Sequence, residues 1–438
     1  MENKIKDIKA WQILDSKGNP ALRVEIETYE GIKGFASVPS GTSKGRFEAF
    51  ELRDNDKSVY GGLGVLKAVN NVKETIKNAL KDKCVLNGYE IDNLLVELDN
   101  TENKSKLGAN AILGVSMAAA CCASKCLNIP LYEYIGGINA VILPVPMINI
   151  INGGAHANNN LDFQEFMITP VGAESFYDAI RMSSEIFHTL EKNLKKENMS
   201  TSVGLEGGFT PDLKTNKDAI ELILNAISDS GYTTDEVKIC LDIASSELYK
   251  DGKYNFRGEN LILDKKEVAE YFEHLVEDYP VISIEDGMAQ DDYDGWRILT
   301  DKLKDKCLLV GDDLFVTNSK LLKEGIENNI ANAILIKPNQ IGTVSETIET
   351  VRIAKNAGYK NIISHRSAET EDTFIADFAV GINSGLIKTG SMSRSERTAK
   401  YNRLLIIEDE LKKSGKYMGL NSYFKNAKIC CNKCNRYG

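Results

Sequence analysis

Six ionisable residues end or directly follow short apolar runs in the second half of the chain. They are Asp242, Glu285, Asp312, Lys337, His365 and Lys388. From Glu285 onward they are 27, 25, 28 and 23 residues apart, close to the length of one strand plus one helix. Continuous apolar runs are typical of parallel strands that are buried on both faces. In a barrel of such strands the carboxyl ends share one rim, so we expect these six side chains to converge there.

The three acids come first in this series and predict a metal site. Asp242, Glu285 and Asp312 would supply hard oxygen ligands from successive strands, and Mg²⁺ prefers a few carboxylates with positions left for water and substrate. The chain has four histidines and nine cysteines, and they are not spaced to form a competing zinc site. The composition of the series therefore favours Mg²⁺.

Three cations in the same region predict an anionic substrate beside that metal. Arg366 offers a fork of N–H donors that fits a phosphate or a carboxylate. Lys337 is a candidate general base, because a nearby metal charge favours the neutral amine. With Lys388 they could instead belong to a structural ion network that only balances the acids.

Three loops rich in glycine and small polar residues could complete such a site. The segments 40–45 (SGTSKG) and 152–160 (NGGAHANNN) suit lids that close over an anion and exclude water. In 204–208 (GLEGG), glycines flank Glu206 and could bring its carboxyl group close to a substrate. Each segment read alone is also compatible with an ordinary surface loop or turn.

The order of apolar and helical segments predicts a barrel preceded by a smaller α+β domain. ALRVEIETY and GIKGFASVP read as antiparallel strands joined at Gly31, and GVLKAVNNVKETIKNAL and NAILGVSMAAACCASKCL read as helices. This unit is predicted to span 1–138. Eight apolar runs follow in 139–425, most of them separated by helical segments, which predicts an α/β barrel. They are VILPVPMINII, FQEFMITP, VKICLDIA, VISIEDG, CLLVGDD, AILIKPN, NIISHRS and LIKTGS.

Composition limits the kind of partner. The 438 residues carry a net charge of −10, which disfavours a nucleic-acid surface or an anionic membrane surface. The longest apolar stretch, Ala111–Ala123, is shorter than the roughly 20 residues that span a bilayer. The charged N-terminus lacks the apolar segment of a signal peptide. We expect a cytoplasmic protein with a small-molecule substrate, no nucleic acid and no membrane span.

The cysteines predict neither a disulfide framework nor a metal centre. Nine thiols in 438 residues are too sparse for the former. The tail 426–438 contains Cys430, Cys431 and Cys434, which is one ligand short of a usual structural zinc site. We expect a disordered tail there in preference to a zinc or redox function.

A series of longer motifs runs through nearly the whole chain. It comprises LDSKGNP at 14–20 and then, in order, SGTSKG, NKSKLGANAILGVSMA, NGGAHANNN, QEFMI, LDIASSE, SIED, GDDLFVTN, NQIGT, SHRSAETEDTFIAD, IKTG and RSER. In this order the motifs resemble those of the enolase family, the phosphopyruvate hydratases. The resemblance implies an N-terminal α+β domain and a variant barrel of the ββαα(βα)6 type. It also implies a lyase that reversibly dehydrates 2-phosphoglycerate to phosphoenolpyruvate in glycolysis and gluconeogenesis.

The same resemblance assigns roles to individual residues. Lys337 is implied as the base and Glu206 as the acid. Two Mg²⁺ ions are implied, the first bound by Asp242, Glu285 and Asp312 and the second by Ser43 with the substrate phosphate. The substrate-binding set is His156, Glu165, Glu285, Asp312, His365, Arg366, Ser367 and Lys388, in which Glu165 supports the acid and Lys388 faces the carboxylate. A homodimer or a higher homo-oligomer is implied as well.

Several residues depart from the family pattern. Leu205 replaces an acid beside Glu206, and the other departures are Trp11, Lys17, Lys44, Gly287, Pro338 and Ala368. Such changes around an intact set of reacting groups can alter rate or substrate. Two alternatives to a working enolase follow. One is a diverged paralogue that acts on another phosphorylated or phosphonylated 2-hydroxy acid, and the other is a binding or scaffold protein without useful catalysis.

Overall fold

The computed structural model describes residues 2–41 and 45–424. These residues fall into two compact units. The first unit contains the described residues 2–41, 45–141, 311–384 and 394–407, and the second contains 142–310, 385–393 and 408–424.

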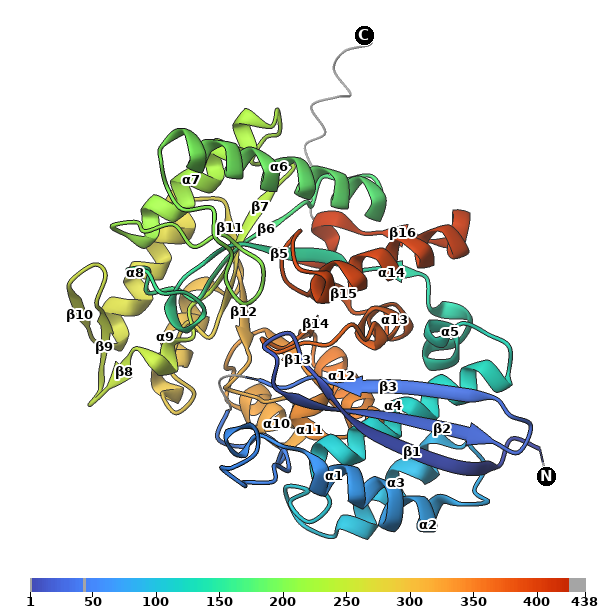
Figure 1. The fold of residues 1–438 in the computed structure, drawn as a ribbon. Helices are drawn as coiled ribbons and strands as arrows, with labels where there is room; N and C mark the ends of the chain where they lie inside the picture. Colours follow the sequence, from blue (N-terminus) through green and yellow to red (C-terminus); the bar gives the residue numbers. More distant parts are fainter. Residues whose placement is uncertain (1, 42–44, 425–438) are drawn as a thin grey trace. The chain divides into compact units, whose positions relative to one another are not determined.

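The N-terminal part of the first unit is built on a three-stranded antiparallel sheet in the order β1-β2-β3 (Figure 1). Its strands are β1 (Ile5–Leu14), β2 (Pro20–Thr28) and β3 (Lys33–Val38). The hairpin predicted around Gly31 is confirmed, because β2 pairs antiparallel with β3. The segment that forms β1 was not singled out as a strand from the sequence.

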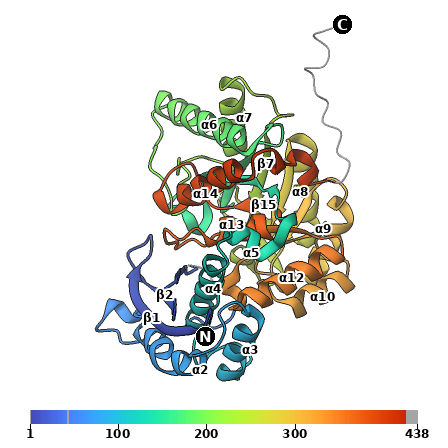
Figure 2. The same ribbon diagram turned by 90° about the vertical axis from the view of Figure 1, so that its right-hand side faces the viewer.

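Helices pack on this sheet. Those that contact it are α1 (Leu66–Asn71), a π-helical segment (Val72–Ile76), α2 (Lys77–Leu80) and α4 (Ala109–Cys126), while α3 (Gly88–Asp99) and α5 (Leu131–Gly136) pack against α4. Helix α4 lies against β2 and β3, as Figures 1 and 2 show. A Cβ atom at Gly34 would collide with the backbone of Ala118 and Cys122, so glycine at this position permits the close packing.

Helix α4 also contains the longest apolar stretch of the sequence. By length and composition alone it could cross a membrane, and among the described residues it is the one helix of this kind. However, 83% of the apolar window is buried inside the protein. This burial is that of a core helix, and it gives no indication of a membrane span.

Eight strands form a closed barrel in the order β11-β12-β13-β14-β15-β5-β6-β7. They are β5 (Val145–Asn152), β6 (Glu165–Thr169), β7 (Lys238–Asp242), β11 (Val281–Glu285), β12 (Leu308–Gly311), β13 (Ala333–Ile336), β14 (Lys360–Ser364) and β15 (Gly385–Lys388). Every residue of β5, β6, β11, β12 and β13 is buried, which confirms the prediction from their continuous apolar runs.

The barrel opens with two strands and then two helices. Strand β6 is antiparallel to both β5 and β7. Helices α6 (Phe176–Lys196) and α7 (Asn216–Asp229) lie between β6 and β7 in the chain. The ββαα opening implied by the resemblance is therefore confirmed.

The remaining helices are α8 (Lys265–Asp278), α9 (Tyr293–Leu303), α10 (Ser319–Glu327), α11 (Pro338–Ile341), α12 (Val344–Asn356), α13 (Phe374–Gly381) and α14 (Ser395–Leu411). Several begin at a side-chain cap. Thr215 and Asp264 form capping boxes at α7 and α8, and Thr343 caps α12. These caps fix where the chain leaves each loop and enters a helix.

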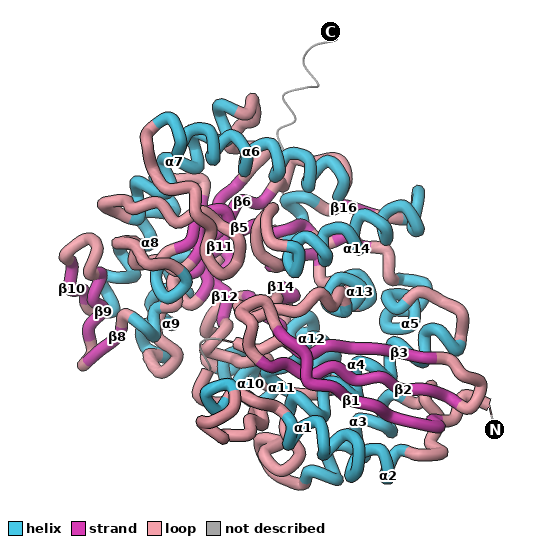
Figure 3. Tube along the Cα trace, viewed as in Figure 1, coloured by secondary structure: helices cyan, strands magenta, loops and turns pink. Residues whose placement is uncertain are grey.

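Short strands complete the description and are drawn in magenta in Figure 3. A small sheet contains β8 (Tyr249–Lys250), β9 (Lys253–Phe256) and β10 (Leu261–Leu263), while β4 (Ile142–Leu143) pairs with β16 (Lys416–Tyr417). Single turns of 3₁₀ helix occur at Tyr60–Gly62, Gly137–Asn139, Gly154–His156, Ser245–Glu247, Lys412–Ser414 and Gly419–Ser422.

Candidate active site

In the second unit, Asp242 and Glu285 form an acidic pair at the ends of two neighbouring strands. They are the last residues of β7 and β11 and are direct partners in the register of these parallel strands. Both side chains are buried. Two buried carboxylates at the same level of one sheet are oxygen donors of the kind that hold a hard divalent cation.

Lys388, the last residue of β15, lies among these carboxylates. Its Nζ atom is 2.9 Å from Asp242 Oδ2, 2.9 Å from Glu285 Oε2 and 3.1 Å from Glu165 Oε2. Burial lowers the pKa of Lys388, but the surrounding carboxylates outweigh burial and hold the pKa well above its usual range. The carboxylates therefore favour the charged form of Lys388 within a buried acidic cluster.

Gln164 was not identified as a site residue from the sequence, but it contacts Asp242. Its Nε2 atom donates to Asp242 Oδ2 at 3.1 Å, and the backbone N–H of Ala244 donates to Oδ1 at 3.1 Å. These donors orient the carboxylate, as partners of metal-binding carboxylates commonly do. The position of Gln164 next to Glu165 in the QEFMI motif is the sequence signal that could have found it.

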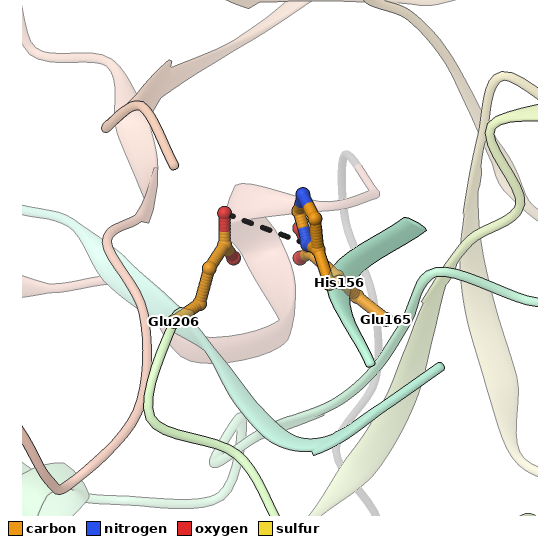
Figure 4. A group of neighbouring side chains, drawn as sticks. All are labelled: His156, Glu165 and Glu206. Atoms are coloured by element: carbon orange, nitrogen blue, oxygen red, sulfur yellow. Dashed lines mark ion pairs between the residues drawn. The ribbon is translucent and has the colours of Figure 1, made fainter. Parts of the chain in front are cut away.

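His156, Glu165 and Glu206 form a second buried group in the same unit (Figure 4). The Nδ1 atom of His156 is 3.6 Å from Glu165 Oε1 and 3.8 Å from Glu206 Oε1. Ligand atoms of the three residues lie within 4.8 Å of one another, a spacing that could also hold a metal ion. The structure thus brings together three residues that lie apart in the sequence.

Glu165 and Glu206 interact as a carboxyl pair. Burial is the largest influence on Glu165, and together with the negative charge of Glu206 and a hydrogen bond between the two it raises the pKa of Glu165 well above its usual range. The charge of Lys388 opposes this shift without cancelling it. Two buried carboxyl groups in contact favour retention of a proton between them, which is the property that a general acid needs.

The loop that carries Glu206 depends on close backbone packing. A Cβ atom at Gly208 would lie 2.8 Å from Asn152 Oδ1 and 2.9 Å from Asn149 Oδ1, so glycine is required there. Asn149 in turn donates from Nδ2 to Glu206 Oε2 at 3.3 Å. Leu205, which replaces the usual acid, is half-buried beside Glu206.

In the first unit, Asp312 and Lys337 form an ion pair just beyond β12 and β13. Lys337 Nζ is 2.5 Å from Asp312 Oδ2, and Gln340 Nε2 donates to Asp312 Oδ1 at 3.0 Å. Pro338 is the first residue of α11. A backbone N–H at this position has no partner within the helix, so proline loses no helical hydrogen bond there. The unusual proline after Lys337 therefore fits the fold.

Arg366 binds a carboxylate that the sequence analysis did not single out. Its Nη1 and Nη2 atoms lie 3.1 and 3.2 Å from the two carboxylate oxygens of Glu48, and Nη1 also donates to Asn339 Oδ1 at 3.0 Å. This two-pronged contact places an acidic group on the fork that was predicted to bind phosphate. The partners are 318 residues apart, and nothing in the local sequence of Glu48 signals the contact.

His365 and Ser367 flank Arg366 and are buried in the same loop. Within each unit the structure brings the predicted residues of that unit together. The convergence of all six strand-end residues on one rim stays a prediction. Ser43, Lys44 and the cysteine tail lie outside the described residues, so the predictions for them stay open.

Comparison with known families gives two matches along the chain. The enolase N-terminal domain model matches residues 5–135, and the enolase C-terminal TIM barrel domain model matches residues 140–426. The chain belongs to the enolase family. Its reaction is therefore expected within lyase chemistry or the wider enolase superfamily, whose enzymes normally use Mg²⁺.

The acidic residues of this enolase-family chain fit such a cation. Asp242 and Glu285 supply buried oxygen donors in register, and Gln164 orients one of them. Hard oxygen donors of this kind suit Mg²⁺ better than softer metals. Lys388 balances the charge of the acidic pair, since its ammonium group contacts both carboxylates.

Proposed function

We propose that this chain catalyses the reversible, Mg²⁺-dependent dehydration of 2-phosphoglycerate to phosphoenolpyruvate. Family membership supports the reaction class. The specific reaction is supported by the presence of both a candidate base and a candidate acid. The candidate base, Lys337, forms an ion pair with Asp312. The candidate acid, Glu206, forms a buried carboxyl pair with Glu165. We further propose a cytoplasmic role in glycolysis and gluconeogenesis, as a homodimer or a higher homo-oligomer.

Lys337 is proposed to remove the proton from the substrate α-carbon. Its Nζ atom must be neutral to accept that proton, and the ion pair with Asp312 favours the charged form. If Asp312 held a cation, this bias would weaken and the amine would be available for general base catalysis. Gln340 holds Asp312 in place by donating to its other oxygen.

Glu206 is proposed to protonate the departing hydroxide. Glu165 supports it, because the buried pair retains a proton, and Asn149 orients the carboxyl group through its contact with Oε2. In the reverse direction Glu206 accepts a proton from the attacking water. His156 lies beside both carboxyl groups and is proposed to contact the substrate.

The remaining site residues are proposed to bind the two anionic ends of the substrate. Lys388 faces the carboxylate, and the fork of Arg366, with His365 and Ser367, binds the phosphate in place of the carboxylate of Glu48. Asp242, Glu285 and Asp312 would hold one Mg²⁺ ion and Ser43 would help to hold a second, and these ions would stabilise the negative charge that develops on the substrate carboxylate. Without that stabilisation the α-proton is too weakly acidic for an amine to remove.

The proposal is tested by ultraviolet absorbance of the enol phosphate formed from 2-phosphoglycerate, with and without Mg²⁺. A Mg²⁺-dependent rise at about 1 to 10³ turnovers per second, the usual range of enzymes, is expected. The variant K337A, prepared in the same way, supplies the background. A flat trace from folded protein that binds Mg²⁺ would overturn the proposal.

Leu205 is the observation that favours a second candidate. An apolar side chain beside Glu206 changes the surroundings of the proposed acid, as expected if the site serves another phosphorylated or phosphonylated 2-hydroxy acid. The same assay with such acids separates the candidates. Turnover of one of them without turnover of 2-phosphoglycerate supports the paralogue, and Mg²⁺ binding without any turnover supports a binding or scaffold protein.

A further inference from the structure

One buried guanidinium group contacts three consecutive residues of the proposed substrate loop. Arg397 lies in α14, and its side chain is fully buried. Its Nη1 atom is 2.6 Å from the carbonyl oxygen of Arg366 and 2.7 Å from Nδ1 of His365, and its Nη2 atom donates to the carbonyl oxygen of Ser367 at 2.8 Å. The three residues directly after β14 are therefore held by a single side chain.

The chemistry of arginine restricts what His365 can be. A guanidinium group carries only donors, so the ring nitrogen that faces it must be an acceptor. Nδ1 of His365 is that nitrogen, because it lies 2.7 Å from Nη1 of Arg397. A neutral imidazole with an unprotonated Nδ1 carries its hydrogen on Nε2. The contact therefore selects one of the two neutral tautomers and disfavours the doubly protonated ring.

The buried charge of Arg397 is itself balanced. Its Nε atom lies 3.5 Å from Glu396 Oε1. Burial raises the pKa of Glu369, but nearby positive charges, those of Lys400 and Arg397 first, outweigh burial and lower it. Glu369 also accepts the backbone N–H of Arg366 at 3.0 Å. The loop is thus held from two sides, by a cation that binds its carbonyls and by an acid that binds its N–H.

We propose that Arg397 is a positioning residue that fixes His365 as the Nε2–H tautomer and presents Arg366 and Ser367 to the phosphate of the substrate. The tautomer follows from the protein alone. The effect on the phosphate rests on the proposed function. Removal of the guanidinium group releases one ring nitrogen and two carbonyl oxygens, so both the tautomer and the loop lose their constraint.

The tautomer is tested by ¹⁵N NMR of protein labelled at histidine, without substrate. The chain has four histidines, so the spectrum is simple, and the variant H365Q assigns the resonances of His365. We expect the Nδ1 resonance of His365 in the range of an unprotonated nitrogen and its Nε2 resonance in the range of a protonated one. A hydrogen on Nδ1 would overturn the proposal, whatever reaction the protein catalyses.

Variants of Arg397 test the positioning role. In R397M we expect the His365 resonances to shift toward a mixture of tautomers, and the KM for 2-phosphoglycerate to rise roughly tenfold or more with a smaller change in kcat. R403M is the matched control, because Arg403 lies on the same helix and binds the carboxylate of Asp377 with two nitrogens. It should leave both the resonances and KM as in the wild type.

If R397M does not fold, R397K is the second variant to test, because it keeps the positive charge. A single ammonium group lacks the planar fork that reaches three acceptors, so we expect the same changes in a smaller degree. Unchanged His365 resonances in a folded Arg397 variant would overturn the proposal. If wild-type protein shows the expected tautomer but does not act on 2-phosphoglycerate, the proposed function fails while the assignment of Arg397 to His365 stands.

Discussion

Asp242 and Glu285 are direct partners in the register of β7 and β11, so their buried carboxylates leave two neighbouring strands at the same level. This relationship follows from the parallel pairing of the strands, because each ends at its acidic residue. Two negative charges that are held together away from water repel each other, and a cation between them offsets this repulsion. Lys388 provides one, and the oxygen donors fit Mg²⁺ as another.

Substitution of Asp242 by asparagine is expected to weaken Mg²⁺ binding by about 100-fold or more, because even residues that only orient a ligand contribute about 10- to 100-fold. Isothermal titration calorimetry with Mg²⁺ measures the change. D235N is a suitable control, because the side chain of Asp235 is 68% exposed and does not belong to the buried acidic pair. An affinity in D242N equal to that of the control would remove Asp242 from the metal site.

Lys337→Ala is expected to abolish exchange of the substrate α-proton with solvent, with a loss of roughly 10²- to 10⁴-fold. The reason is that the variant lacks the amine that accepts the proton. Exchange is followed by proton NMR of 2-phosphoglycerate in deuterated water. Persistence of exchange in folded K337A, at a rate near that of the wild type, would assign the base to another residue.

Glu206→Gln is expected to spare α-proton exchange and to block loss of hydroxide. An amide preserves the shape of the side chain but cannot donate a proton to the leaving group. The two readings, exchange by NMR and enol phosphate by absorbance, are taken on one sample. Equal loss of both in E206Q would contradict the division of labour between Glu206 and Lys337.

Leu205→Asp restores the acid that is usual in the family beside Glu206. If divergence has only weakened this enzyme, kcat for 2-phosphoglycerate should rise several-fold in L205D, because the surroundings of the acid return to the common pattern. Steady-state absorbance assays measure the gain. An unchanged or lower kcat would indicate that the surrounding residues are already adapted to leucine.

Cys240 predicts a pH dependence of stability. Burial on β7, opposed by a hydrogen bond with Tyr423, raises the pKa of the Cys240 thiol to about 12. Because the folded pKa is raised, the stabilisation is present below the unfolded value of about 8.5 and is lost as pH rises toward 12. Between pH 8 and pH 10 the free energy of unfolding should fall by about 2 kcal/mol more in the wild type than in C240A.

Urea unfolding at the two pH values measures this difference. I239V is the matched control, since Ile239 is a buried neighbour on β7 without an ionisable group. It should lower stability by about 1 kcal/mol at both pH values and leave the slope unchanged. The same slope in C240A and in the wild type would show that the thiol does not titrate differently in the folded and unfolded states.

The strands and helices that carry the site could be predicted from the sequence more completely than the contacts between their side chains. The run VKICLDIA indicated a buried strand that ends at Asp242, and the structure confirms this as β7. Strand β1 and helix α3 were not identified individually, although the apolar residues of α3 recur at helical spacing. The boundary at 138/139 stays a prediction.

By itself the sequence determined the family, most of the order of strands and helices, and a polar residue at or directly after the end of six of the eight barrel strands, because apolar runs and motifs are local properties of the chain. Only the tertiary structure decided which side chains meet. Glu48 binds Arg366 across 318 residues, and Arg397 selects the tautomer of His365 across 32. Such contacts depend on how packed elements place individual atoms, which no local period encodes.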